Sequence, residues 1–304
     1  MDSLRSAARR TLHPLSARWS RLPGSLRGAV WTLLAAVGFT GMSVCIKFAG
    51  QTMPVWEIIV LRAGFALTIF APAIARSGLA SFRTERFGAH FLRAVFGVLG
   101  VSTMMLSITH LDLTLATTLG FTRALFMIVL AVVFLGELIR WRRSIATFVG
   151  FIGVVICMQP DPSGIDPWIL VGLLAALFAA GVTTMIKRLT ATEPPLRIIV
   201  LSYLMIGLMA AIPAWAVWKA PTFSELAIIA LMGLFSAWGQ TCMVHGLRAA
   251  DATIVVPLDY TRLLYAAIIG FFVFSEVPSW STWVGGAIIV SSTLYIALRE
   301  AYLA

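Results

Sequence analysis

Two arginines and one aspartate lie in the middle of long apolar stretches. Arg123 is the ninth residue of the stretch 115–135, Arg262 is the tenth residue of 253–275, and Asp259 precedes Arg262 by three residues. A charge at the centre of a bilayer costs about 2.5–3.5 kcal/mol on insertion scales, so such residues need a partner or a function. A guanidinium group presents a planar fork of N–H donors that fits a carboxylate or phosphate. Both arginines are therefore candidates for binding an anionic substrate.

The other ionisable groups of these stretches leave alternatives open. The arginines could instead brace helices through backbone carbonyls or internal acids, and Asp259 shares a helix face with Arg262, so this pair is expected to interact. Asp259 and Glu57 are the acids within the stretches, and either is a candidate coupling group, because proton-driven transport needs a buried carboxyl group that gains and loses a proton. Glu57 is also expected at the membrane interface. Arg62 lies deeper, whereas Arg93 is near an end from which it can reach the membrane surface.

Aromatic and amide side chains near these charges are candidates for lining a binding site. Phe121, Tyr260 and Trp238 could stack on a planar substrate, although ordinary packing or lipid contact would place them equally well. Gln240 is a mid-stretch amide that needs a cavity or another helix to satisfy it. The histidines and cysteines show no metal-ligand spacing, so neither a metal nor another cofactor is expected.

The overall composition indicates a membrane protein. The chain has 304 residues, of which 60% are hydrophobic and 12% charged, and its mean hydropathy is +0.93. Soluble domains carry about 25% charged residues. A soluble fold of this length exposes too much surface to be covered by so few polar side chains. The composition therefore argues against a soluble enzyme, a disordered chain and a nucleic-acid binder.

The apolar stretches predict an all-α polytopic membrane protein with ten transmembrane helices. A helix needs about 20 apolar residues to cross about 30 Å of hydrocarbon, and continuous runs of this length favour helices over the strands of a barrel. The predicted spans are 28–49, 55–75, 90–110, 115–135, 144–160, 168–187, 198–218, 226–245, 253–275 and 282–298.

The basic residues predict the orientation of these helices. With both termini in the cytoplasm, 17 of the 23 Lys and Arg residues fall in inside segments, while Lys219 alone falls outside. This positive-inside bias favours an N-in, C-in topology and accounts for the net charge of +10 without an acidic partner. Residues 1–27 are expected to form a basic cytoplasmic tail.

The chain also repeats itself. Five short segments recur in order at an offset of about 140 residues, and they predict two five-helix units, 28–160 and 168–298. The matches include 41–47 with 181–187, 58–61 with 198–201, and 121–125 with 260–264. Because five is odd, the second unit must enter the membrane from the opposite side. Inverted repeats of this kind are common in secondary transporters, in which two halves rock around a central site.

These repeats carry a family resemblance. The segment 252–289, with Pro257-Leu258 and Phe274-Ser275-Glu276-Val277-Pro278, resembles the second repeat of the EamA family of the drug/metabolite transporter superfamily. Phe134-Leu135-Gly136-Glu137 resembles the corresponding part of the first repeat. The resemblance implies a secondary transporter of a small organic metabolite, such as an amino acid, nucleoside or vitamin, in a bacterial inner membrane. The general pattern is closest to the metabolite-uptake type, such as transporters of S-adenosylmethionine or riboflavin.

Two other functions remain open at this stage. A flippase for lipids or amphipathic molecules would use the same architecture. An integral-membrane enzyme would need His, Asp or Glu residues clustered at one membrane face, and the sequence has no such cluster. The expected partners are a small-molecule substrate and the lipid bilayer, without nucleic acid, and a homodimer is left open.

Overall fold

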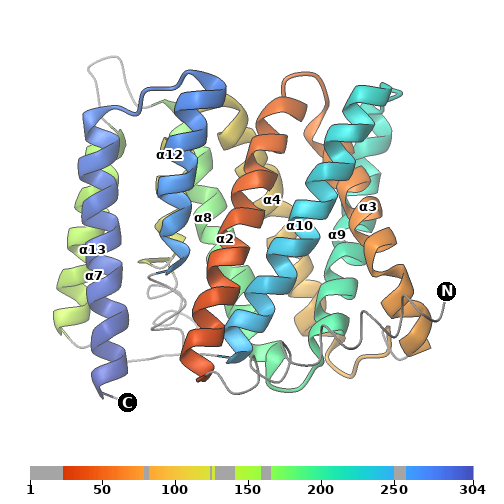
Figure 1. Ribbon diagram of the computed structural model, residues 1–304, viewed down its shortest axis with the longest axis horizontal. Coiled ribbons are helices and arrows are strands. Elements are labelled where there is room, and N and C mark those ends of the chain that lie inside the picture. The colour runs from red at the N-terminus through yellow and green to blue at the C-terminus, as the bar shows by residue number, and fades with distance from the viewer. Residues whose placement is uncertain are drawn as a thin grey trace, which may run out of the picture.

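The computed structural model describes residues 23–78, 82–123, 125–126, 141–158, 166–249 and 258–303. This part of the chain contains ten helices. They are α2 (Gly24–Ala49), α3 (Val55–Ser77), α4 (Phe87–His110), α5 (Leu113–Phe121), α7 (Trp141–Met158), α8 (Pro167–Thr190), α9 (Pro195–Val217), α10 (Phe223–Ala249), α12 (Thr261–Phe274) and α13 (Trp280–Leu303). The helices stand roughly side by side, as Figure 1 shows.

Six of these helices are long and apolar enough to cross a bilayer. They are α2, α3, α4, α8, α9 and α10, and their most apolar windows have a mean hydropathy between 1.6 and 2.3. The helix α12 is apolar but shorter. Prolines mark several starts because a proline fits the first turn of a helix, where its missing N–H is not needed. Pro167 opens α8, and Asp166 caps the same helix by accepting a hydrogen bond from the backbone N of Trp168 at 2.9 Å.

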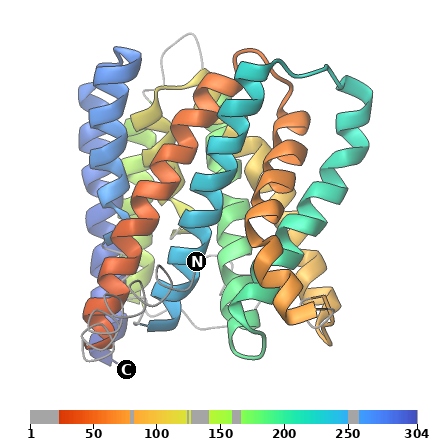
Figure 2. The same ribbon diagram turned by 45° about the vertical axis from the view of Figure 1, so that its right-hand side comes forward.

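The helices pack in reciprocal pairs. The most extensive contacts are α2 with α10, α4 with α8, α7 with α13, and α3 with α9. If the first five spans are matched in order with the last five, exchanging the halves turns the pair α2–α10 into α8–α4 and leaves α3–α9 and α7–α13 unchanged. The observed pairs are therefore those that a two-fold relation between the halves would produce. In both views of the ribbon, α7 and α13 lie at one side of the bundle (Figures 1 and 2).

The helix pair α2–α10 crosses at very short range. A Cβ atom added to Gly38 would lie 2.9 Å from the backbone N of Gly239 and 3.1 Å from the carbonyl oxygen of Phe235. Small residues at helix crossings allow such close backbone approach in membrane proteins. Gly38 thus fixes the position of α2 beside the central polar residues described below.

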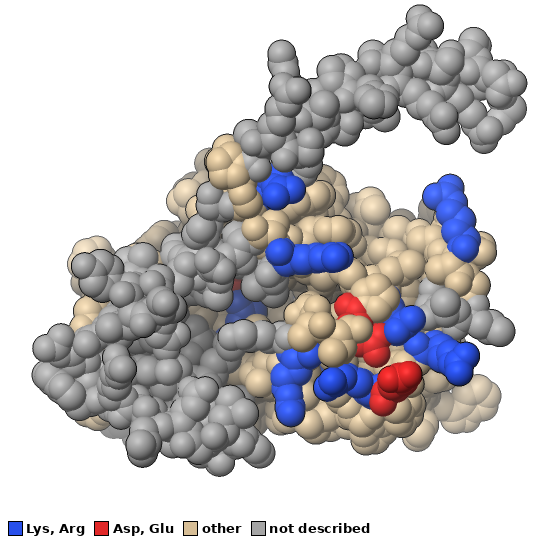
Figure 3. All heavy atoms as spheres, turned by 90° about the horizontal axis from the view of Figure 1, so that it is seen from below, with Lys and Arg blue, Asp and Glu red and all other residues tan. Residues whose placement is uncertain are grey.

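The structure agrees with the predicted all-helical membrane fold, while other predictions are not decided by it. The fourth and ninth predicted spans fall partly, and the tail 1–27 mostly, outside the described residues. Exposed arginines gather at the end of the bundle where α2 begins, and Figure 3 shows this face from below. They include Arg76, Arg83, Arg86, Arg188 and Arg248. The assignment of this face to the cytoplasm stays a prediction.

Candidate functional site

Two helical segments related by the sequence repeat are interrupted at positions that differ by one residue in the repeat alignment. Thr122 and Tyr260 are turn residues with helical residues on both sides. Next to these interruptions, the hydroxyl groups of two repeat-related threonines donate to the carbonyl three residues earlier. The Thr122 hydroxyl donates to Leu119 O at 2.6 Å and the Thr261 hydroxyl to Leu258 O at 2.7 Å. The two halves therefore build the same local backbone feature, and it positions the charged residues beside it.

The interruptions lie near the middle of the bundle. Arg123 follows the first residue of α5 by ten positions, which is about 15 Å along a helix, or half of the hydrocarbon core. Arg262 precedes the last residue of α12 by twelve positions. These two helix ends lie at the same end of the bundle, because Glu276, just after α12, accepts a hydrogen bond from the backbone N of Leu113. Both arginines therefore lie at similar depth.

Asp259 joins the two arginines. Its Oδ2 accepts a hydrogen bond from the Nη2 of Arg123 at 3.0 Å, and its Oδ1 lies 3.9 Å from the Nη1 of Arg262. The Asp259 side chain is 4% exposed, whereas that of Arg123 is 29% exposed. The predicted interaction of Asp259 with Arg262 is present, and the stronger contact to Arg123 is one that the sequence alone did not indicate. We refer to Arg123, Asp259 and Arg262 as the central triad.

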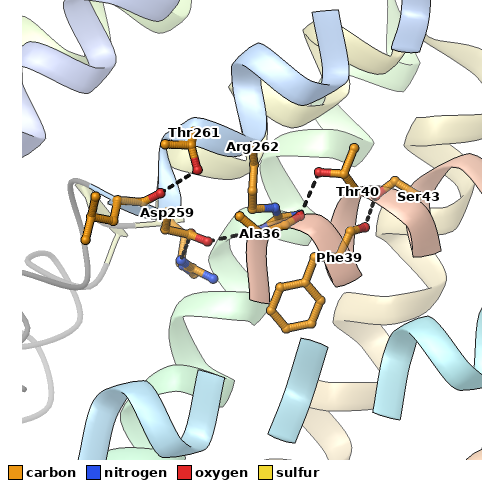
Figure 4. A network of polar contacts seen from close by, with 9 residues as sticks. Ala36, Phe39, Thr40, Ser43, Asp259, Thr261 and Arg262 are labelled. Atoms are coloured by element: carbon orange, nitrogen blue, oxygen red, sulfur yellow. Dashed lines mark hydrogen bonds and ion pairs between the residues drawn. The ribbon is translucent and has the colours of Figure 1, made fainter. Parts of the chain in front are cut away.

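Aromatic rings flank the central triad. The rings of Phe121 and Tyr260 meet edge to face with their centroids 4.8 Å apart. The guanidinium carbon of Arg262 lies 5.2 Å from the centroid of the Phe39 ring of α2, a cation–π contact. Figure 4 shows the Arg262 side chain extending from α12 toward Phe39 of α2. The sequence prediction did not include Phe39, because nothing along the chain connects α2 with this region.

The site has the chemistry of an anion-binding centre that is partly neutralised. Two guanidinium groups and one carboxylate leave one net positive charge, and a low-dielectric surrounding strengthens its attraction for an anion. Among the described residues, the Oδ1 of Asp259 and the Nε of Arg262 have no hydrogen-bond partner. A bound molecule with both an anionic and a cationic group could therefore satisfy the triad more completely than the triad satisfies itself.

Comparison with known proteins identifies the family. The sequence profile described as the EamA-like transporter family matches residues 26–159 and again 166–298. The chain belongs to this family. An S-adenosylmethionine uptake transporter of Rickettsia felis is 30% identical over 90% of this chain and 94% of the relative. A riboflavin transporter of Rhizobium johnstonii is 32% identical over 90% of this chain and 91% of the relative.

A solved structure supports the fold of this EamA family member. The similarity to that crystal structure has a TM-score of 0.64 and covers 91% of this chain and 98% of the other, at 16% sequence identity. Together with the apolar helices, the family places the chain among multi-pass membrane proteins that transport small molecules.

The family motif around Glu276 makes a second ion pair at one end of the bundle. Glu276 pairs with Lys47 at the end of α2, and its other oxygen accepts from the backbone N of Leu113 at 2.7 Å. Lys47 also donates to Leu111 O at 2.9 Å and lies over the Phe274 ring. This contact ties the ends of α2 and α12 to the start of α5. Lys47 and Glu276 both lie in segments that the sequence analysis identified, but their contact was not predicted from the sequence.

The structure does not bring every predicted site residue to the triad. Among the described residues, no hydrogen bond, ion pair or ring contact joins Gln240 or Trp238 to the triad, and Trp238 is exposed on α10. Glu57 lies in the first turn of α3 and is fully buried in the protein, where its Oε2 accepts from the backbone N of Lys219 at 3.3 Å. Its depth relative to the membrane interface stays a prediction. Arg93 is likewise buried and donates to Ile198 O, so its side chain does not extend to the surface.

Proposed function

We propose that this chain is a secondary transporter that carries a small organic metabolite with a carboxylate group across a bacterial inner membrane. The central triad is the substrate site in this proposal. The observation that carries it is the pair of arginines held at mid-depth by one shared, buried carboxylate. A purely structural role would be served by one arginine for one acid.

Arg123 is the group that receives the substrate carboxylate. Its side chain is the more exposed partner of the Arg123–Asp259 pair. A substrate carboxylate can replace Asp259 at Arg123 and can bind it in bidentate geometry, while Asp259 stays beside Arg262. A cationic group on the same substrate would then lie near the Asp259 oxygen that Arg123 has released.

The proposed alternating access is supported by the fact that the residues of the triad belong to different repeats. Arg123 belongs to the first repeat, and Asp259 and Arg262 belong to the second. A contact that forms in one arrangement of the halves and breaks in another biases the equilibrium between the two arrangements. Substrate binding at Arg123 would therefore alter the link between the halves.

The substrate class we favour contains a carboxylate, a cation and a planar ring. S-adenosylmethionine, the substrate in the names of several relatives, has all three. Its carboxylate suits Arg123, its sulfonium or ammonium group suits Asp259, and its adenine ring suits the aromatic pair Phe121 and Tyr260. Riboflavin, named for other relatives, offers a planar ring without a carboxylate, so the triad fits it less well.

Glu57 is the better candidate for a proton-coupling group. Asp259 is already engaged by two guanidinium groups. Glu57 is fully buried, and its Oε1 has no hydrogen-bond partner among the described residues. Replacing Glu57 with Gln should make uptake into proteoliposomes insensitive to an imposed pH gradient, whereas Asp259→Asn should reduce uptake with and without the gradient. Unchanged gradient dependence in Glu57→Gln would exclude this role.

The main experiment is a ligand screen by thermal shift on the purified protein in detergent. A ligand that binds the folded state raises the melting temperature by mass action. S-adenosylmethionine should raise it more than riboflavin, free nucleosides or single amino acids, and Arg123→Ala should abolish the rise. Arg188→Ala, which removes an exposed arginine at the end of α8, is the matched control. A shift that is the same in Arg123→Ala and in the unmodified protein would refute the proposed site.

A further inference from the structure

A second pair of arginines is buried between four helices. Arg62 of α3 is 4% exposed and Arg93 of α4 is 2% exposed. Among the residues that the structure describes, neither guanidinium group has a carboxylate within ion-pair distance. A buried charge that lacks a counter-charge destabilises a protein strongly. The arrangement therefore requires compensation from another source.

The polar groups that surround these arginines compensate them only partly. The Nη1 of Arg62 donates to the Ser236 hydroxyl at 2.6 Å, and this hydroxyl lies 2.8 Å from the Tyr203 hydroxyl. The Arg62 guanidinium carbon is 5.7 Å from the centroid of the Tyr203 ring. The Nη1 of Arg93 donates to Ile198 O at 3.2 Å. In the part of the chain that the structure describes, the Nε atoms of both arginines are buried without any hydrogen-bond partner.

Arg62 and Ser236 both contact Tyr203, and Arg93 contacts the helix of Tyr203 through Ile198 O. Arg62, Arg93, Tyr203 and Ser236 come from α3, α4, α9 and α10, respectively. The site thus contains two positive charges, two hydroxyl groups and unfilled N–H groups, all enclosed by helices. Its surroundings are small apolar side chains that include Ala63, Ala66 and Ala237.

We propose that Arg62, Arg93, Tyr203 and Ser236 form a binding site for a small inorganic anion of halide size. One monovalent anion would halve the uncompensated charge and accept hydrogen bonds from the free N–H groups. An organic metabolite needs a pocket of about 300–1,000 Å³, so side chains this deeply buried suit a small anion better. Among the described residues, no hydrogen bond or ion pair joins this site to the central triad, and the proposal does not depend on the proposed substrate.

The test replaces chloride with gluconate at constant ionic strength, using the purified full chain in detergent. Chloride should raise the melting temperature in a saturable manner, and chloride NMR should show an excess line width that bromide removes and phosphate does not. Arg62→Gln and Arg93→Gln should lose both effects. Ser236→Ala should weaken the chloride affinity about five-fold. Arg188→Gln, at an exposed position, should behave like the unmodified protein.

Several outcomes would overturn the site. The same melting temperature in chloride and gluconate, with no excess line width, would show that no halide binds. If Arg62→Gln fails to fold, Ser236→Ala decides, and an unchanged chloride affinity in it refutes the proposal. Loss of the chloride effect in Arg123→Gln, together with its retention in Arg62→Gln, would move the anion to the central triad. Equal competition by phosphate would rule out a halide-sized site.

Discussion

Arg123 donates a hydrogen bond to Asp259 at 3.0 Å, although the two residues are 136 positions apart in the chain. Each comes from a different repeat of the EamA family. Asp259 also lies 3.9 Å from Arg262, the residue that the repeat matches with Arg123. One carboxylate is thus shared by two arginines that occupy equivalent positions in the two halves. The pseudo-symmetry of the sequence is broken at this carboxylate, because the first half has Gly120 at the equivalent position.

Removing the charge of Asp259 should destabilise the protein. Asp259→Asn leaves two partly buried guanidinium groups without their carboxylate, and breaking a fully buried ion pair from one side typically costs about 3–5 kcal/mol, which is an upper bound here. The melting temperature in detergent should fall clearly. The double variant Arg123→Gln/Asp259→Asn should recover part of the loss, because one of the two uncompensated charges is also gone.

The Asp259 and Arg123 variants form a double-mutant cycle, and its control combines Asp259→Asn with Arg188→Gln. Arg188 is exposed, so this pair should show additive effects, as distant sites usually do. If the Arg123 and Asp259 effects were also additive, the 3.0 Å contact would carry no net interaction energy.

Weakening the Lys47–Glu276 pair should open the end of the bundle where α5 begins. Glu276→Gln removes the charge that holds both Lys47 and the backbone N of Leu113. Thr114, next in the chain, is fully buried. In a background without the native cysteines, Thr114→Cys should react several-fold faster with a membrane-impermeant maleimide when Glu276→Gln is present.

The labelling result has a clear contrary outcome. Equal reaction rates with and without Glu276→Gln would mean that the ion pair does not control access to α5. Glu85→Gln is a suitable control, because Glu85 is exposed and lies between Arg83 and Arg86 at the arginine-rich end.

The close crossing of α2 and α10 should not tolerate a methyl group. Gly38→Ala would place a Cβ within about 3 Å of backbone atoms of Gly239, and backbone cannot move aside as a side chain can. Overpacking of this kind typically costs about 1–3 kcal/mol, so the melting temperature and transport should both fall. Gly64→Ala is the matched control, because a Cβ there would meet nothing within 4 Å. Equal stability of the two variants would contradict the crossing.

Glu193 should make stability depend on pH at the arginine-rich end. Burial by itself raises its pKa, but hydrogen bonds from Thr84 at 2.6 Å and Arg197 at 2.5 Å, with the charge of Arg197, hold the pKa below the ordinary value of 4.5. A carboxyl group with a lowered folded-state pKa contributes stability above its unfolded value, and this contribution is lost as the pH falls through the folded value.

Glu193→Gln should therefore lower the melting temperature near pH 7, and the difference from the unmodified protein should shrink as the pH falls below 4.5. Melting curves over this pH range test the prediction. A difference that is constant over the whole range would assign the effect of the variant to packing rather than to charge.

The sequence predicted much of the fold because membrane insertion imposes strong local rules. A helix that crosses the hydrocarbon must be apolar over about 20 residues, so α2, α3, α4, α8, α9 and α10 can be read directly from composition along the chain. The five-helix repeat and the family resemblance depend likewise on order and spacing. The short helices α5 and α12 were harder to delimit, since each lies beside an interruption within a single apolar stretch.

The candidate charged residues were also visible in the sequence, because the bilayer makes every internal charge unusual. What the sequence could not give was which charges meet. Asp259 and Arg262 share one helix face, so their interaction follows from helical geometry. The contacts of Asp259 with Arg123, and of Lys47 with Glu276, join segments that are far apart in the chain.

The sequence by itself thus determined which segments are helical, that the chain repeats, and which residues are chemically unusual inside the membrane. Only the tertiary structure decided the partners: Asp259 between two arginines, Phe39 against Arg262, and Arg62 against Ser236 and Tyr203 with no carboxylate at ion-pair distance among the described residues. The physical reason is that backbone hydrogen bonding and hydrophobicity act over a few residues, whereas ion pairs form wherever packing brings charges together. Close helix crossings such as that of Gly38 with Gly239 set that packing.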